Sequence, residues 1–231
     1  MGAVSAPGRD RVAANLVRIR ERIAAAGGDL ARITIVAVTK GFGPEVVAAA
    51  RAAGLGDLGE NYAAELVDKA QLAATDRAGG PLRWHFLGAV QRNKVGRLAP
   101  HVHLWQSVDR IEAGRAIARH RPGAQVLLQV DLSGDPGKAG CPRSEAPELV
   151  RGLRGLDLEV AGVMGVGPNG PPEGARPGFR WLAALAGDLG LAEVSMGMSD
   201  DLEVAVEEGA TMVRVGRGLF GPRPAVAGLQ R

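Results

Sequence analysis

A lysine at the end of an apolar segment is the clearest candidate for chemistry in this sequence. Lys40 closes the run Val36-Ala37-Val38-Thr39-Lys40. A lysine in this position either extends to the solvent-exposed rim, a structural role, or keeps its amine partly buried. Partial desolvation lowers the pKa of the amine and makes it a nucleophile that can form a Schiff base.

Two glycine-rich stretches match the pattern G-x-G-x-x-G, at Gly165–Gly170 and Gly216–Gly221. Neither is typical of a dinucleotide site, because prolines follow the first and too few residues follow the second for a βαβ unit. A glycine turn after the last strand of a barrel is, however, the usual place for a phosphate group. There the Ser199 hydroxyl and backbone amides would be donors; an ordinary tight turn is the alternative.

Arg214 lies inside the last apolar segment, between Val213 and Val215. Strand alternation places its side chain on the opposite face from both valines. A guanidinium that points into a core needs a partner. That partner is either a ligand or a carboxylate such as Glu60.

The elements that position these residues alternate between short apolar strands and Ala/Leu-rich helices. The predicted strands are Ile33–Val38, Gly56–Glu60, Trp84–Leu87, Val102–Gln106, Gln125–Val130, Leu158–Met164, Glu193–Met198 and Thr211–Val215. Their spacing of about 25 residues fits one strand, one helix and two loops. Eight such units predict an α/β fold with a closed (β/α)8 barrel, which places its functional residues where the strands end.

We expect a single domain over residues 1–231. An additional N-terminal helix would span about 10–27, with Asp10 as its N-cap and Gly27-Gly28 ending it. The barrel would span about 33–221, followed by a short C-terminal tail. The Pro/Gly-rich segment Gly165–Gly178 reads as a surface loop after the sixth strand.

Composition narrows the class of protein. Of 231 residues, 46% are hydrophobic and the net charge is only +3, which is typical of a globular chain and demands no nucleic-acid partner. The single cysteine, Cys141, excludes an internal disulfide and indicates a reducing compartment. We find no secretory signal, no membrane span and no metal-ligand cluster, and therefore expect a cytoplasmic protein.

Taken together, the motifs resemble the pyridoxal phosphate homeostasis proteins, which are similar to the N-terminal barrel of alanine racemase standing alone. The resemblance covers most of the chain, in family order and spacing. Its motifs are Val36–Lys40, Gly59–Tyr62, His85–Gly88 with Gln91, Asn93 and Lys94, Lys138–Gly140, Gly162–Met164, Ser195–Asp201, Val213–Gly216 and Phe220-Gly221.

The resemblance implies pyridoxal 5′-phosphate (PLP) as the cofactor, held by Lys40 as a Schiff base. Ser199, Gly216 and the Arg217 amide would take the phosphate, and Arg214 would face the pyridine nitrogen. Asn61 would lie near the ring and Met164 would line the pocket. His85, Asn93 and Lys94 follow the family motif, but a core or helix-cap role is an equal alternative.

The same resemblance indicates PLP homeostasis or delivery with little or no catalysis. Arginine always donates, so the ring nitrogen it contacts stays unprotonated and is a weaker electron sink. The racemases take a second base, a tyrosine, from a C-terminal domain, whereas the only tyrosine here is Tyr62. The alternatives are a PLP-dependent amino-acid racemase and a Schiff-base aldolase acting on a phosphosugar. We expect a monomer or weak dimer, with apo forms of PLP-dependent enzymes as partners.

Overall fold

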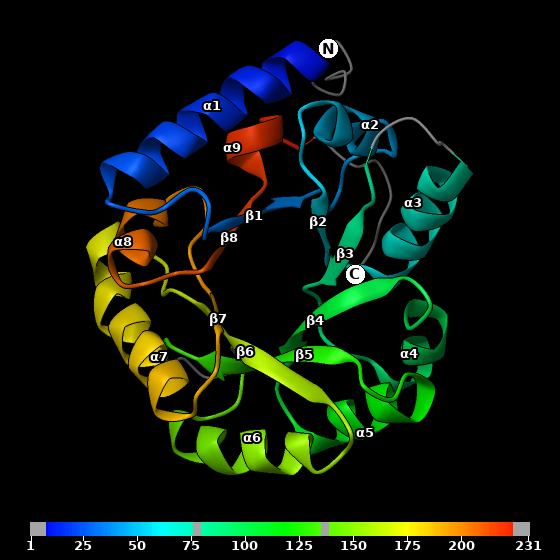
Figure 1. The fold of residues 1–231 in the computed structure, drawn as a ribbon, viewed down its shortest axis with the longest axis vertical. Helices are drawn as coiled ribbons and strands as arrows, with labels where there is room; N and C mark the ends of the chain where they lie inside the picture. The colour runs from blue at the N-terminus through cyan, green and yellow to red at the C-terminus, as the bar shows by residue number, and fades with distance from the viewer. Residues whose placement is uncertain (1–7, 76–79, 135–138, 224–231) are drawn as a thin grey trace.

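The computed structural model describes residues 8–75, 80–134 and 139–223. Within these ranges, eight parallel strands follow one another around a closed barrel, and the last strand pairs with the first. Helices surround this ring of strands (Figure 1). The predicted (β/α)8 barrel is confirmed.

The strands lie close to their predicted positions because each is a short run of buried, mostly apolar residues. They are β1 (Thr34–Val38), β2 (Asp57–Glu60), β3 (Arg83–Phe86), β4 (Val102–Val108), β5 (Gln125–Asp131), β6 (Glu159–Val166), β7 (Glu193–Ser195) and β8 (Met212–Val215). Parallel strands covered by helices are buried on both faces, which explains their near-continuous hydrophobicity.

The helices between the strands expose one face to solvent and bury the other against the barrel. They are α2 (Glu45–Ala52), α3 (Ala63–Thr75), α4 (Arg92–Leu98), α5 (Ile111–His120), α6 (Ala146–Arg154), α7 (Arg176–Asp188) and α8 (Leu202–Glu207). A short helix, α9 (Arg217–Phe220), follows β8, and two 3-10 turns, η1 (Arg143–Glu145) and η2 (Pro172–Ala175), precede α6 and α7.

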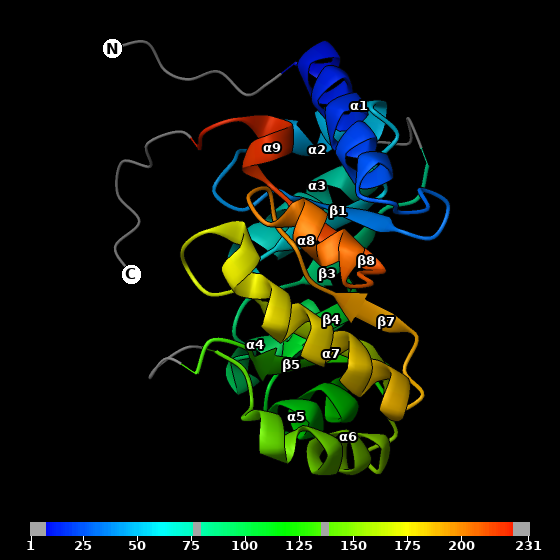
Figure 2. The ribbon, with the colours of Figure 1, turned by 90° about the vertical axis from the view of Figure 1, so that its left-hand side faces the viewer.

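The additional N-terminal helix is α1 (Arg9–Ala25), which lies beside α9 and α2 on the outside of the barrel (Figures 1 and 2). Its buried stripe contains Leu16 and Ile19. The prediction that Asp10 caps this helix is wrong. Gly8 occupies the N-cap, and Asp10 falls in the first turn, where its negative charge still favours the helix dipole.

The segment after β6 is less irregular than predicted. β6 continues to Val166, and α7 begins at Arg176, so η2 and five residues make up the connection instead of the whole segment Gly165–Gly178. Conversely, β7 is shorter than predicted. Gly197, with φ +87°, turns the chain soon after Ser195, and a Cβ there would approach the Ala205 Cβ to 2.5 Å.

The core has two layers. A large layer fills the space between the strands and the helices. A smaller apolar cluster occupies the barrel interior and consists of Val36, Leu104, Leu127, Met164 and Met212. Buried polar side chains, among them Arg214, also lie in this interior.

No helix in the described ranges combines the length and apolar character needed to cross a lipid bilayer.

Candidate functional site

The residues predicted to do chemistry gather at the carboxyl ends of the strands, which meet at one end of a parallel barrel. This barrel mouth is formed by the residues that end or follow β1, β2, β6, β7 and β8. The structure places there Lys40, Asn61, Met164, Ser199, Arg214, Gly216 and Arg217.

Lys40 follows β1 and is half-buried at the mouth. Burial is the main cause that lowers the pKa of its amine. The positive charges of Arg223 and Arg214 lower the pKa of Lys40 further, while the carboxylate of Glu60 acts in the opposite direction. A lowered pKa raises the fraction of neutral amine, which is the form that attacks a carbonyl carbon.

A buried ionic cluster holds the segment that carries Lys40. Lys69 of α3 donates to the Thr39 carbonyl at 2.8 Å and pairs with Glu60 Oε1 at 2.5 Å. Thr39 Oγ1 donates to the same Glu60 oxygen at 2.6 Å, and Glu65 accepts from the Gly41 amide at 2.9 Å. The residues on both sides of Lys40 are therefore fixed by α3 and β2.

Sequence reasoning missed this cluster. The signal available was Glu65 and Lys69 at helical (i, i+4) spacing, directly after a strand that ends in Glu60. Burial raises the pKa of the Glu60 carboxyl, and the charge and hydrogen bond of Lys69 oppose this shift. The alternative that Glu60 is the ion-pair partner of Arg214 is wrong, because the charged partner of Glu60 is Lys69.

Two buried oxygens at the mouth have no hydrogen-bond partner among the described residues. They are Glu60 Oε2 and Asn61 Oδ1, on adjacent residues at the end of β2. Buried polar atoms are normally paired, because an unpaired one costs roughly 1–3 kcal/mol. The mouth is thus prepared for polar groups that the protein does not itself supply.

The loops after β7 and β8 meet at Ser199. The Gly218 amide donates to Ser199 Oγ at 3.1 Å, and Arg22 of α1 donates to the Ser199 carbonyl at 2.9 Å. The Arg217 side chain turns outward to Asp200, at 2.8 Å, so only its backbone amide can serve the mouth. A Cβ at Gly216 would lie 3.2 Å from the Val38 carbonyl oxygen, which favours glycine there.

Arg214 points into the barrel, on the same face of β8 as Met212 of the interior apolar cluster. It is 5% exposed, and its Nη1 and Nη2 donate to Ser195 Oγ and the Gly165 carbonyl, each at 2.8 Å. Burial lowers the pKa of Arg214 to about 10, and Asp201 opposes the shift. The guanidinium therefore stays charged at neutral pH, with no carboxylate bonded to it among the described residues.

The other residues of the motifs have different positions. Met164 is 3% exposed within the interior apolar cluster. His85 is buried in the core, which agrees with the core role given above as one alternative, and it forms hydrogen bonds with Asp57 and Gln106. Asn93 and Lys94 lie in the first turn of α4, where Gln91 is the N-cap, so neither caps the helix. Lys138, from another motif, lies outside the described residues.

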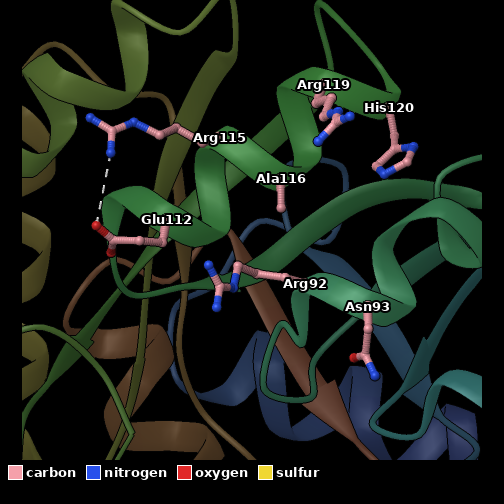
Figure 3. A pocket seen from close by; sticks show the side chains of 7 residues that line it. All are labelled: Arg92, Asn93, Glu112, Arg115, Ala116, Arg119 and His120. Carbon is pink, nitrogen blue, oxygen red and sulfur yellow. Dashed lines mark ion pairs between the residues drawn. The ribbon is translucent and has the colours of Figure 1, made fainter.

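A surface groove of about 720 Å³ lies outside the barrel, between α4 and α5. Its lining consists of Arg92, Asn93, Glu112, Arg115, Ala116, Arg119 and His120 (Figure 3). These side chains are exposed, apart from the half-buried Ala116. The groove lacks a buried amine or guanidinium such as those at the mouth, which remains the candidate site.

A metal-binding cluster is absent from the part of the chain that the structure describes. No group of three or more His, Cys, Asp or Glu side chains there could hold a metal ion. Cys141 is buried, and burial raises the pKa of its thiol to about 12, so the thiolate is scarce at neutral pH.

Comparison with known proteins identifies the class to which this barrel belongs. Residues 9–224 match the family model "Alanine racemase, N-terminal domain". An alanine racemase from Clostridium difficile 630 shares the fold, with a TM-score of 0.70 at 16% identity; the match covers 91% of this chain and 57% of that one. The chain is therefore a barrel of the alanine racemase N-terminal type.

Nearer relatives define the family. Pyridoxal phosphate homeostasis proteins from Pseudomonas aeruginosa and Deinococcus radiodurans are each 40% identical, over 93% and 90% of this chain and 95% and 99% of theirs. PipY of Synechococcus elongatus PCC7942, solved with PLP bound, matches at a TM-score of 0.76 and 31% identity, covering 91% of this chain and all of that one. The chain belongs to the pyridoxal phosphate homeostasis protein family.

Proposed function

We propose that this protein binds PLP at the barrel mouth through a Schiff base with Lys40. The observation that carries the proposal is the half-buried Lys40 amine, whose pKa is lowered, at the same mouth as the buried cation Arg214. PLP, when bound, supplies an aldehyde that condenses with a primary amine. The name of the homeostasis relatives and the PLP-bound PipY support this choice of cofactor.

The residues at the mouth fit the other parts of the cofactor. Ser199, Gly216 and the Arg217 amide would hold the phosphate, where the loops after β7 and β8 meet. Asn61 would lie near the ring, where its Oδ1 has no partner among the described residues. Met164 would line the pocket from β6.

Arg214 would face the pyridine nitrogen and donate to it. Because an arginine cannot accept a hydrogen bond, the nitrogen must accept and stays unprotonated. An unprotonated ring withdraws electrons poorly, so chemistry at a bound amino acid is weakly driven. Arg214 therefore favours holding the cofactor over turning over a substrate.

We infer that the protein buffers PLP or delivers it to apo forms of PLP-dependent enzymes in the cytoplasm, as a single-domain monomer or weak dimer. Exchange of one amine for another at Lys40 would release the cofactor without hydrolysis or oxidation. The buried cluster around Thr39, Glu60 and Lys69 keeps this segment in place during such an exchange.

Titration with PLP tests the proposal through visible absorbance. Wild type is expected to develop the absorbance band of a PLP Schiff base, and Lys40→Ala is expected to lose it. Lys94→Ala is the matched control, because Lys94 lies in α4 and outside the mouth. A colourless wild type, or an undiminished band in Lys40→Ala, would contradict the proposal.

The same samples separate a carrier from a racemase. We expect no conversion of L-alanine by PLP-loaded wild type above the rate of PLP alone. Conversion that Lys40→Ala abolishes would establish the enzyme instead.

A further inference from the structure

A continuous series of hydrogen bonds crosses the barrel interior, from the mouth to the opposite end. Arg214 Nη1 donates to Ser195 Oγ at 2.8 Å, and Ser195 Oγ donates to Gln106 Oε1 at 2.7 Å. Gln106 Nε2 lies 2.8 Å from His85 Nδ1, and His85 Nε2 lies 2.9 Å from Asp57 Oδ1. These five buried residues come from five different strands, and we call them the axial chain.

The axial chain ends at the amino ends of two strands. Asp57 is the first residue of β2, and Arg83, which pairs with it at 2.5 Å, is the first residue of β3. The amino ends of the strands lie opposite the mouth. Burial acts to raise the pKa of Asp57, but hydrogen bonds from His85 and Arg83 outweigh it and lower the pKa to about 2.

With a neutral His85 ring, the two ends of the axial chain determine the direction of every bond between them. A guanidinium only donates, and an ionised carboxylate only accepts. In the neutral ring, His85 donates from Nε2 to Asp57, and Nδ1 is then the acceptor for the Gln106 amide. The Gln106 oxygen then faces Ser195, whose hydroxyl accepts a hydrogen bond from Arg214 and donates one to Gln106 Oε1.

We propose that Ser195, Gln106, His85 and Asp57 are positioning residues that hold the Arg214 guanidinium in one orientation toward the bound ligand. The inference deepens the proposed function, on which it rests, because it concerns the side chain expected to meet the pyridine nitrogen. Without Ser195 as a fixed acceptor, the side-chain hydrogen bond to the Gly165 carbonyl alone would hold the charged group.

Burying five polar side chains in the barrel interior costs free energy, which indicates that the axial chain does more than fill space. The neighbours in the barrel interior are apolar, including Val36, Leu127 and Met212. Polar groups in such surroundings are expensive unless every one is paired. No fully buried side-chain nitrogen or oxygen of the axial chain lacks a partner among the described residues. A complete network of this kind specifies one geometry, since a change at any link leaves a buried group unpaired.

The first test uses cofactor-free wild-type protein and does not depend on PLP. Long-range ¹H–¹⁵N correlation spectra at neutral pH report which ring nitrogen of His85 carries the proton. We expect Nε2 protonated and Nδ1 unprotonated. A proton on Nδ1 of the neutral ring would reverse the direction of the axial chain and overturn the proposal.

The second test compares two buried glutamines. Gln106→Leu breaks the axial chain, whereas Gln129→Leu removes the same group from β5, where Gln129 donates to the Ala139 carbonyl. We expect Gln106→Leu to weaken PLP binding about tenfold, as for loss of one buried hydrogen bond, and to shift the absorbance maximum of bound PLP. Gln129→Leu should do neither. Equal effects of the two variants would overturn the proposal.

A conservative variant separates positioning from packing. Gln106→Glu keeps an acceptor for Ser195 and places a carboxylate oxygen, which only accepts, opposite His85 Nδ1. We expect PLP affinity closer to wild type than in Gln106→Leu, with the His85 ¹⁵N signals changed. A Glu variant that binds as weakly as the Leu variant would count against the proposal. Failure of wild type to bind PLP would instead refute the proposed function. The tautomer measurement would still test the hydrogen-bond directions of the axial chain, because it uses cofactor-free protein.

Discussion

Lys40 experiences opposing electrostatic influences at the mouth. Burial and the charges of Arg223 and Arg214 lower the pKa of its amine, while Glu60 raises it. The balance favours a neutral, nucleophilic amine over a wider range of pH than a free lysine side chain has, whose pKa is about 10.4. Glu60 is therefore a means of adjusting the reactivity of Lys40.

Glu60→Gln tests this adjustment. The variant removes a negative charge that favours the ammonium form, so the pKa of Lys40 should fall further. At a fixed pH below the pKa of Lys40, a lower pKa gives a larger fraction of neutral amine. PLP should therefore react severalfold faster at neutral pH, and the rate–pH profile should be displaced to lower pH. Stopped-flow absorbance measures the rate at each pH.

Glu159→Gln is the control, because it makes the same change of charge at the amino end of β6, away from the mouth. A profile for Glu60→Gln that is unchanged or displaced to higher pH would contradict the electrostatic account.

At the residue scale, the sequence predicted which side chains matter better than it predicted their partners. Lys40 and Arg214 stand out because a charged residue in or beside an apolar strand is unusual. The partner of Arg214, Ser195, has an ordinary sequence context, and the choice between it and Glu60 depends on the stagger of strands around the barrel. That stagger is a property of the closed ring and leaves no local signal.

At the scale of elements, tight packing between neighbouring loops fixes the mouth. The loop after β3 lies against the loop after β2 so closely that a Cβ at Gly88 would come within 1.8 Å of the Asn61 carbonyl oxygen. Because that oxygen belongs to the backbone, a small rotation cannot relieve the clash. Ser107 Oγ also donates to the Gly88 carbonyl, which ties β4 to the same place.

Gly88→Ala is therefore expected to lower the free energy of unfolding by about 1–3 kcal/mol, as for overpacking in a core. It should also weaken PLP binding, since Asn61 must move. Urea unfolding and PLP titration are the measurements.

Gly187→Ala provides a control of opposite sign. Gly187 lies inside α7 with open space around it, so alanine should stabilise the protein by about 0.5–1 kcal/mol. A Gly88→Ala variant as stable as wild type would show that the two loops are not packed as described.

Strand and helix positions were predictable because apolar runs alternate regularly with amphipathic stretches. The errors fall at ends, where single residues decide. Asp10 reads as an N-cap by residue type, yet Gly8, two residues earlier, occupies the N-cap and the helix begins at Arg9. β7 stops at Ser195, before its predicted end, because Gly197 turns the chain with a positive φ.

At the scale of the whole molecule, the mouth and the groove between α4 and α5 offer two different places for an anion. The groove carries Arg92, Arg115 and Arg119, which are exposed (Figure 3). Exposed charges are screened by salt over about 8–10 Å. The buried Arg214 and the half-buried Lys40 at the mouth are screened much less, so PLP should bind there.

The double variant Arg115→Gln/Arg119→Gln should accordingly leave the dissociation constant for PLP within about twofold of wild type at physiological salt. Fluorescence or absorbance titration measures it. A loss of tenfold or more would show that the groove, and not the mouth, holds the cofactor.

The axial chain also belongs to this scale, because it exists only when five strands converge. Its members are separated by up to 157 positions along the chain, from Asp57 to Arg214. His85 belongs to one of the sequence motifs, but its neighbours in the sequence do not indicate its role. Closure of the barrel creates the role.

Reduction of the PLP-treated protein with borohydride, followed by digestion and mass measurement of the peptides, tests the central claim most directly. Borohydride makes a Schiff base permanent, so the added mass identifies the ligand and the modified peptide identifies the amine. The sequence contains four lysines, Lys40, Lys69, Lys94 and Lys138. We expect the mass of reduced PLP on the peptide that contains Lys40; a label confined to another lysine, or no label, would contradict the account.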